Sequence, residues 1–164
     1  MTERISPEML LRFSGYGPRY TSYPTAPEWV SSVSSKQLNV SIAGLSGPVS
    51  AYVHIPFCRE QCTFCGCNMV VAGRTDAGTR YLDALERRID ALPLPSLKVP
   101  TARIHLGGGT PTWLTCEQMD RLFGLLYSRF ELVSGAEVSV EADPEVTTDQ
   151  HLSLIHISEP TRPY

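Results

Sequence analysis

Apolar and polar residues alternate in three short stretches of the chain, and each stretch predicts a β-strand. Residues 51–55 place Tyr52 and His54 on one face and three apolar side chains on the other. Residues 102–106 and 137–141 repeat the alternation. The pattern therefore predicts three strands, each with one apolar and one polar face.

Two longer stretches have the spacing of amphipathic helices. Residues 79–92 carry apolar side chains three and four positions apart, and prolines follow them. Residues 115–130 open with Thr115, an N-cap residue type, and have Gln118 at the capping-box position. A shorter helix is predicted within residues 36–45.

The predicted elements alternate as strand, helix, strand, helix, strand, which is typical of βαβ units in a parallel α/β sheet. The carboxyl ends of parallel strands meet at one edge of the sheet, where such folds place their chemistry. A cysteine-rich loop follows the first strand, the run Gly107–Thr112 follows the second, and Glu141 ends the third. We therefore expect these three features to lie on the same rim.

Composition agrees with a globular chain and excludes several other classes. The 164 residues are 42% hydrophobic and 19% charged, and the net charge of −3 does not suggest a nucleic-acid-binding surface. No apolar run approaches the roughly 20 residues that span a bilayer. Glu3 and Glu8 lie where a signal peptide would need apolar residues. We expect a cytoplasmic protein that binds neither nucleic acid nor membrane.

Four of the five cysteines are crowded together, as Cys58, Cys62, Cys65 and Cys67. Such crowding without an export signal indicates a metal site in a reducing compartment and not a disulfide framework. The first three offer thiolates on one short loop, which suits a 4Fe–4S cluster with one iron left open for a small molecule. A structural zinc site is the main alternative, although zinc more often uses two separated pairs of ligands.

Four segments of the chain carry a resemblance to a known family. Tyr52–Cys67 resembles the signature of the radical S-adenosylmethionine (SAM) enzymes. Together with Arg19–Thr25, Gly107–Thr112 and Glu141–Pro144, it is similar to one family of that superfamily, the oxygen-independent coproporphyrinogen III oxidases. The resemblance covers about residues 16–151, with the segments in the expected order.

Two features favour this family over the haem chaperone-like members of the same superfamily. Those members typically have another residue at the position of Cys67, and they lack a segment like Arg19–Thr25. A haem chaperone-like radical SAM protein stays as the first alternative. A non-catalytic zinc-binding module is the second.

The resemblance implies roles for most of the motif residues. It implies that the cluster ligands are Cys58, Cys62 and Cys65. It implies that one SAM molecule binds at Tyr52, Gly108 and Glu141, and a second at Phe64, Gly109 and Thr110. It also implies that Cys67 acts in catalysis without binding iron.

Simpler interpretations of the same residues stay open. Cys67 could be a packed thiol, Phe64 a shield that keeps water from the cluster, and Glu141 a solvated strand end. His54 and His105 are interpreted as ordinary strand histidines and not as catalytic groups. Cys116, outside every motif, is interpreted as a structural cysteine.

The resemblance also implies a reaction. Two propionate groups of coproporphyrinogen III would be oxidatively decarboxylated to vinyl groups by SAM-dependent radical chemistry, giving protoporphyrinogen IX in haem biosynthesis. An electron donor and an electron acceptor, which the sequence does not identify, are implied as partners, and we expect a monomer. Arg19 and Tyr23 are our own candidates for contacting the propionates, because a guanidinium can donate two parallel hydrogen bonds to a carboxylate.

The last residues do not continue the family pattern. Residues 152–164 resemble the translation of a sequencing-library adapter. We therefore divide the chain into an irregular N-terminal extension (1–48), the first βα units of a partial, TIM-like radical SAM barrel (49–151) and an artefactual tail (152–164). Because three strands cannot close a barrel, we expect the chain as written to be poorly folded and inactive.

Overall fold

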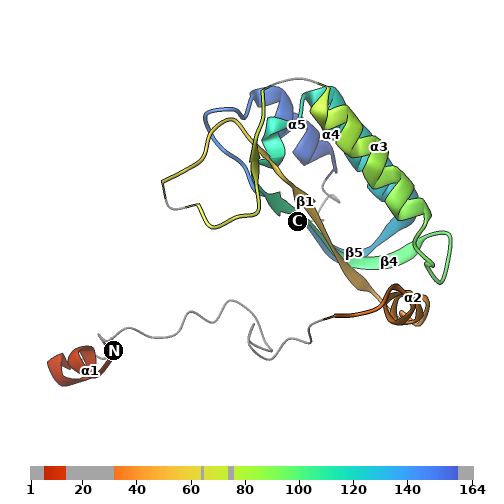
Figure 1. The fold of residues 1–164 in the computed structure, drawn as a ribbon, viewed down its shortest axis with the longest axis horizontal. Coiled ribbons are helices and arrows are strands. Elements are labelled where there is room, and N and C mark those ends of the chain that lie inside the picture. The colour runs from red at the N-terminus through yellow and green to blue at the C-terminus, as the bar shows by residue number, and fades with distance from the viewer. Residues whose placement is uncertain (1–5, 14–31, 64, 74–75, 159–164) are drawn as a thin grey trace. The chain divides into compact units, whose positions relative to one another are not determined.

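The computed structural model describes residues 6–13, 32–63, 65–73 and 76–158. The chain divides into two compact units, Met1–Ser34 and Ser35–Tyr164. In the first unit, helix α1 (Pro7–Phe13) begins after Ser6 (Figure 1). The Ser6 hydroxyl accepts a hydrogen bond from the backbone N–H of Met9 at 3.2 Å, which caps the start of this helix.

The second unit contains the predicted order of strands and helices, with short elements added. Its elements are α2 (Ser35–Ala43), β1 (Val49–Ile55), β2 (Phe57–Cys58), β3 (Val70–Val71), α3 (Ala77–Asp90), β4 (Val99–Gly108), the 3₁₀ turn η2 (Pro111–Trp113), α4 (Cys116–Arg129), β5 (Phe130–Val140) and α5 (Asp149–Ser158). The three longer strands form one parallel sheet in the order β1-β4-β5 (Figure 1). The predicted α/β chain with a parallel sheet is confirmed.

Alternation along the strands gives the sheet a core face and a polar face. On β4, Ile104 and Leu106 are fully buried, whereas Arg103 is exposed and His105 is half-buried. Helices α3 and α4 lie side by side over the core face (Figure 1). Each large aliphatic side chain buried there contributes about 1.5–3 kcal/mol. The core consists of Val53, Ile55, Leu82, Ile89, Ile104, Leu106, Trp113, Leu114, Met119, Leu122, Phe123 and Leu126.

The register of the sheet aligns polar side chains from all three strands. Tyr52 of β1 pairs with His105 of β4, and His105 pairs with Ser139 of β5. These residues have the parity that points away from α3 and α4. The predicted common rim is therefore present, and a polar row leads along the sheet toward it.

The start of α4 follows the sequence prediction. The Thr115 hydroxyl accepts a hydrogen bond from the Gln118 N–H at 3.2 Å, and the Gln118 side-chain oxygen accepts one from the Thr115 N–H at 3.0 Å. This confirms the capping box. The Gln118 amide also donates to the Thr79 hydroxyl at 3.1 Å, which ties α4 to α3.

Strand β5 begins at Phe130, earlier than the alternating pattern predicts. Its first residues pair with Val99 and the residues that follow it, but the register shifts between Thr101 and Arg103. Gly135 has a φ of 77° within the extra residues, a conformation that glycine adopts without strain. This irregularity breaks the alternation, so the sequence pattern marks only the second half of the strand.

Helix α5 extends across residue 152, the predicted start of the foreign tail. His151 is buried, and its Nε2 lies 2.8 Å from the carbonyl oxygen of Leu114. Leu154 and Ile155 are half-buried against the core. These contacts do not test where the residues come from, so the foreign tail stays a prediction.

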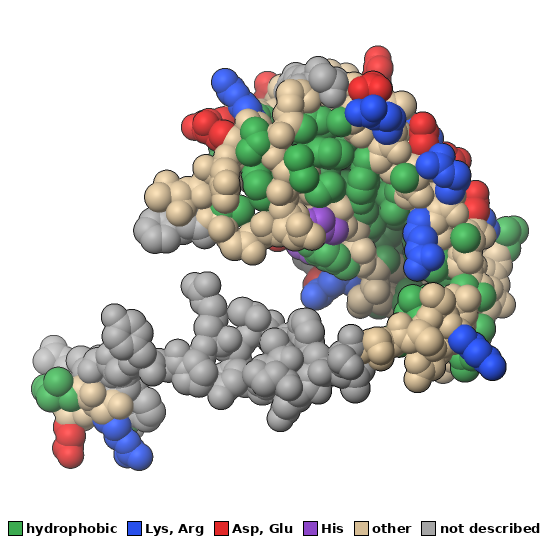
Figure 2. Space-filling model, viewed as in Figure 1, with side chains coloured by type: hydrophobic (Ala, Val, Ile, Leu, Met, Phe, Trp, Pro, Cys, Tyr) green, Lys and Arg blue, Asp and Glu red, His purple; other side chains and the backbone are tan. Residues whose placement is uncertain are grey.

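The surface of the second unit carries interspersed acidic and basic side chains on its helical side (Figure 2). One group joins the two covering helices: Arg121 of α4 lies 2.7 Å from Asp83 and 2.8 Å from Glu86, both on α3. Such exposed pairs contribute little individually. None of the helices in the described part of the chain is long and apolar enough to cross a membrane.

Candidate functional site

The cysteine loop is closed at its base by a two-stranded parallel ladder that the sequence pattern does not predict. Strands β2 and β3 pair Phe57 with Val70 and Cys58 with Val71. The N–H of Val70 donates to the carbonyl of Pro56 at 2.7 Å, and the N–H of Ala72 donates to the carbonyl of Cys58 at 3.1 Å. The loop that carries the remaining motif cysteines therefore leaves and re-enters the fold at fixed points.

The cysteines differ in exposure, and all five are free thiols. Cys58 is buried at the strand end, Cys65 is half-buried, and Cys62 and Cys67 are exposed. The N–H of Cys65 donates to the carbonyl of Cys62 at 3.1 Å, which forms a turn between them. Within the described ranges, no three His, Cys, Asp or Glu side chains lie close enough together to hold one metal ion. The structure thus places three thiols on one braced loop without gathering them around one point.

Cys58 also contacts the end of β4. Its Sγ lies 3.4 Å from the Thr110 hydroxyl, and both side chains are buried. The N–H of Gly109 donates to the carbonyl of Ile55, and the N–H of Thr110 donates to the carbonyl of Phe57, both at 2.8 Å. These bonds place the glycine run directly against the base of the cysteine loop.

The close approach leaves no room for side chains at two of the glycines. A Cβ at Gly109 would lie 2.7 Å from the Phe57 carbonyl oxygen and 2.9 Å from the Cys58 sulfur. Gly108 has a φ of 114°, and a Cβ there would lie 2.8 Å from the His54 ring. Glycine is therefore required at Gly108 by its positive φ as well as by packing, and at Gly109 by packing.

Glu141 reaches the glycine run, as the predicted common rim requires. Its N–H donates to the carbonyl of Leu106 at 2.9 Å, which extends the β4–β5 ladder by one bond. Its Oε2 accepts a hydrogen bond from the N–H of Gly108 at 3.1 Å. The side chain remains about half exposed, so a carboxylate is presented at the rim with one oxygen already held by the backbone.

Tyr52 lies on the same face of the sheet. Its hydroxyl lies 3.2 Å from Nδ1 of His54, and its ring stacks on His105 with centroids 5.7 Å apart. Desolvation, followed by the charges of Glu141 and Cys67, raises the pKa of Tyr52 above its ordinary value. The phenol therefore keeps its proton and remains a hydrogen-bond donor.

The two histidines that we interpreted as ordinary strand residues take part in this network. The Nε2 of His54 lies 2.7 Å from the carbonyl oxygen of Asn68, which fastens β1 to the far side of the cysteine loop. The Nδ1 of His105 lies 2.7 Å from the Ser139 hydroxyl, and its Nε2 lies 3.5 Å from Oε1 of Glu141. Polar residues at matching alternate positions of neighbouring strands are the sequence signal that could have indicated the contact between His105 and Ser139.

Cys67 lies near the same group of residues. Desolvation raises the pKa of its thiol, and the charge and hydrogen bonding of Cys65, then the charge of Glu141, add to this rise. Phe64 and the segment Arg19–Thr25 lie outside the described residues. The rim thus brings together Tyr52, Cys58, Cys65, Cys67, Gly108, Gly109, Thr110 and Glu141 from three strand ends and one loop.

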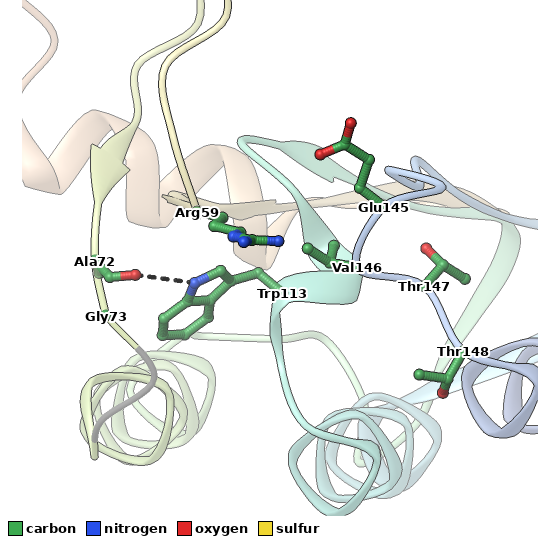
Figure 3. Close-up of a pocket in the computed structure, with 8 residues that line it drawn as sticks. All are labelled: Arg59, Ala72, Gly73, Trp113, Glu145, Val146, Thr147 and Thr148. Carbon is green, nitrogen blue, oxygen red and sulfur yellow. Dashed lines mark hydrogen bonds between the residues drawn. The ribbon is translucent and has the colours of Figure 1, made fainter.

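A cavity of about 500 Å³ lies beside the base of the cysteine loop (Figure 3). Trp113 forms one wall, and its indole N–H donates to the carbonyl of Ala72 at 3.1 Å. Arg59 lies beside the indole, and Glu145 borders the far side (Figure 3). No residue that the resemblance assigns to SAM is among its described lining residues, so this cavity is separate from the rim site.

Named relatives resemble the chain over most of its length. It is 41% identical over 138 residues to the oxygen-independent coproporphyrinogen III oxidase of Escherichia coli (strain K12), a match covering 83% of this chain and 30% of that protein. It is also 41% identical over 138 residues to the protein of the same name from Mannheimia haemolytica, covering 83% of this chain and 94% of that protein. No protein-family model matches the chain.

The fold matches a solved structure as well. Coproporphyrinogen III oxidase (HemN) from Escherichia coli, a radical SAM enzyme, is similar with a TM-score of 0.77 and 37% sequence identity. The match covers 91% of this chain and 33% of that one. The chain therefore spans about a third of the length of these Escherichia coli proteins.

Proposed function

This chain belongs to the family of oxygen-independent coproporphyrinogen III oxidases, and we propose that it carries the cofactor-binding start of an enzyme with that activity. The observation that supports this most is the meeting of three strand ends beside one cysteine loop. There the Gly108 N–H binds the Glu141 carboxylate at 3.1 Å, and Thr110 contacts Cys58. Backbone donors and a carboxylate beside thiols are the groups that SAM and an iron–sulfur cluster require.

The chemistry of the donor set fits a 4Fe–4S cluster. Thiolates are the ligands such clusters use, and Cys58, Cys62 and Cys65 provide three of them from one loop. Binding requires the loop to turn Cys62 and Cys65 toward Cys58, whose position is fixed by β2 and β4. When bound, the cluster and SAM supply one-electron radical chemistry that no protein side chain provides.

The chain's own residues bind and orient SAM at the rim. The Glu141 carboxylate has the charge to bind the amino group of SAM, and the Gly108 N–H already holds one of its oxygens at 3.1 Å. Tyr52 places a protonated phenol beside them. We assign Phe64, Gly109 and Thr110 to a second SAM molecule, on the resemblance alone.

The floor of the site keeps water away from the cluster ligand. The Phe57 ring packs against Trp113 with centroids 4.6 Å apart, and Trp113 is only 4% exposed. The core side of Cys58 is therefore shielded from water, which strengthens electrostatic interactions at the rim.

Cys67 is exposed on the loop, and we assign it to catalysis without binding iron.

The proposed substrate is coproporphyrinogen III, with two propionates converted to vinyl groups to give protoporphyrinogen IX in haem biosynthesis. The electron donor and acceptor stay unidentified, and we place the enzyme in the cytoplasm as a monomer. Since the chain spans about a third of its Escherichia coli relatives, we propose that residues 49–151 begin a longer barrel. We also propose, from the resemblance of residues 152–164 to an adapter translation, that this segment is foreign, and that the chain alone is inactive because three strands cannot close a barrel.

The test begins with the genomic reading frame that encodes residues 1–151. We expect it to continue in frame for several hundred residues; a genuine stop after Tyr164 would contradict the proposed truncation. The protein encoded by that whole frame, called the full-length protein below, should form protoporphyrinogen IX from coproporphyrinogen III anaerobically with SAM and a reductant. Haem transfer without this conversion would favour the chaperone-like alternative, and a colourless zinc protein would favour the zinc-binding module.

A further inference from the structure

Strands β4 and β5 carry a ladder of polar pairs that ends at the rim. Arg103 pairs in register with Glu137, and their side chains form an ion pair at 2.5 Å. Two residues further on, His105 pairs with Ser139, with Nδ1 2.7 Å from the hydroxyl. The next position on β5 with the same parity is Glu141. The ladder therefore leads from a surface ion pair to the carboxylate that we assign to SAM.

The position on β4 beside Glu141 is a glycine, and its lack of a side chain has a direct consequence. A Cβ at Gly107 would lie 3.0 Å from Oε2 of Glu141 and 3.1 Å from Nε2 of His105. The space above Gly107 is therefore shared by the carboxylate and the imidazole. They approach each other across it, with Nε2 of His105 3.5 Å from Oε1 of Glu141.

We propose that His105 is a positioning residue that holds the Glu141 carboxylate in the orientation that binds SAM. The inference rests on the proposed function, since it takes Glu141 as a SAM ligand. One carboxylate oxygen, Oε2, accepts a hydrogen bond from the Gly108 N–H, and the other, Oε1, faces His105. With one oxygen hydrogen-bonded to the β4 backbone and the other 3.5 Å from the β4 imidazole, the orientation of the carboxylate is restricted before SAM arrives.

The imidazole is itself held on two sides. The Ser139 hydroxyl lies 2.7 Å from Nδ1, and when that hydroxyl is the donor, a neutral imidazole carries its proton on Nε2, the nitrogen that faces Glu141. The Tyr52 ring stacks on the imidazole at an interplanar angle of 23°. Three strands therefore cooperate in orienting one exposed carboxylate. Preorganisation of this kind improves affinity because less side-chain freedom is lost when the ligand binds.

The test uses substitutions at His105 in the full-length protein with its cluster reconstituted anaerobically. His105→Asn keeps an amide nitrogen near the position of Nδ1, and His105→Gln places one near the position of Nε2. SAM affinity, measured by equilibrium dialysis with iron and sulfide content as a check, should fall roughly three- to tenfold in His105→Asn. His105→Gln should remain close to wild type. Arg103→Ala, one step back on the same ladder, should leave SAM affinity unchanged.

Each outcome separates this inference from the proposed function. Equal SAM affinity in His105→Asn and wild type, or equal losses in His105→Asn and His105→Gln, would overturn the positioning role. Glu141→Gln is the reference: if it weakens SAM binding while His105→Asn does not, only the positioning role fails. If Glu141→Gln leaves SAM affinity unchanged, Glu141 is not the ligand and the proposed function of this rim fails with it.

Discussion

The Thr110 hydroxyl lies 3.4 Å from the Cys58 sulfur, with both side chains buried where β2 and the end of β4 meet. This contact joins the first cysteine of the loop to the residue that directly follows the three glycines. A hydroxyl next to a thiolate can donate a hydrogen bond that stabilises negative charge on the sulfur.

Replacing Thr110 by Val should lower the reduction potential of the cluster. The substitution keeps the shape of the side chain and removes the hydrogen bond, and the reduced cluster, which carries more negative charge, loses more stabilisation than the oxidised one. A redox titration followed by electron paramagnetic resonance measures the shift. Thr110→Ser retains the hydroxyl and should keep the wild-type potential. An unchanged potential in Thr110→Val would show that the contact does not affect the cluster.

Gly109→Ala should prevent the cysteine loop from assembling a cluster. The added methyl group would lie 2.7 Å from a backbone oxygen and 2.9 Å from the Cys58 sulfur, so the backbone must move. Iron and sulfide analysis after reconstitution measures the loss. Gly124→Ala is the matched control, because a Cβ at that exposed position in α4 meets no atom within 4 Å. Gly124→Ala should keep the cluster and raise the free energy of unfolding by about 0.5–1 kcal/mol.

Because of Tyr81, the free energy of unfolding should fall as the pH rises into the alkaline range. Its hydroxyl donates to the His54 carbonyl at 2.6 Å, and desolvation, then Tyr52, raises its pKa. Tyr81→Phe should therefore lower the free energy of unfolding by about 0.5–1.5 kcal/mol near neutral pH.

The sign of the pH effect follows from the raised pKa. Below the unfolded pKa of about 10, both states keep the Tyr81 proton and the full contribution is present. As the pH rises through the folded pKa, the unfolded state ionises first and the contribution is lost. Urea unfolding between neutral pH and about pH 11 should show the gap between wild type and Tyr81→Phe closing. A constant gap would mean that Tyr81 has an ordinary pKa.

The cysteines should separate into three groups when each is replaced by Ser in the full-length protein. Substitution of Cys58, Cys62 or Cys65 should abolish iron binding, whereas Cys67→Ser should keep the iron and lose activity. Cys116 is half-buried with its sulfur 4.0 Å from the Thr148 hydroxyl. Cys116→Ser should therefore keep both the iron and the activity. Iron analysis and product assay together distinguish the groups. Loss of iron in Cys67→Ser would make Cys67 a ligand instead.

The meeting of Gly108 and Glu141 could be predicted from the sequence, because the ends of parallel strands share an edge whatever their side chains. Strands β2 and β3 could not be predicted, since each has two residues and no periodicity. The early half of β5 was missed because the irregularity around Gly135 interrupts the alternation. Local patterns reveal strand ends more readily than the breaks within strands.

The histidines show a different limit. On its own strand each reads as a polar residue facing away from the core, and that placement is correct. Their partners, Asn68 for His54 and Glu141 for His105, lie in other elements. Only the register of the three strands reveals that His105, Tyr52 and Ser139 share one level.

The central claim is that this rim holds an iron–sulfur cluster with SAM bound beside it. The most direct measurement is the electron paramagnetic resonance spectrum of the reduced, reconstituted full-length protein with and without SAM. We predict a 4Fe–4S signal whose shape changes when SAM is added, and no such change in Glu141→Gln at a SAM concentration that saturates wild type. A protein with zinc and no iron signal, or a cluster signal that SAM leaves unchanged, would contradict the account.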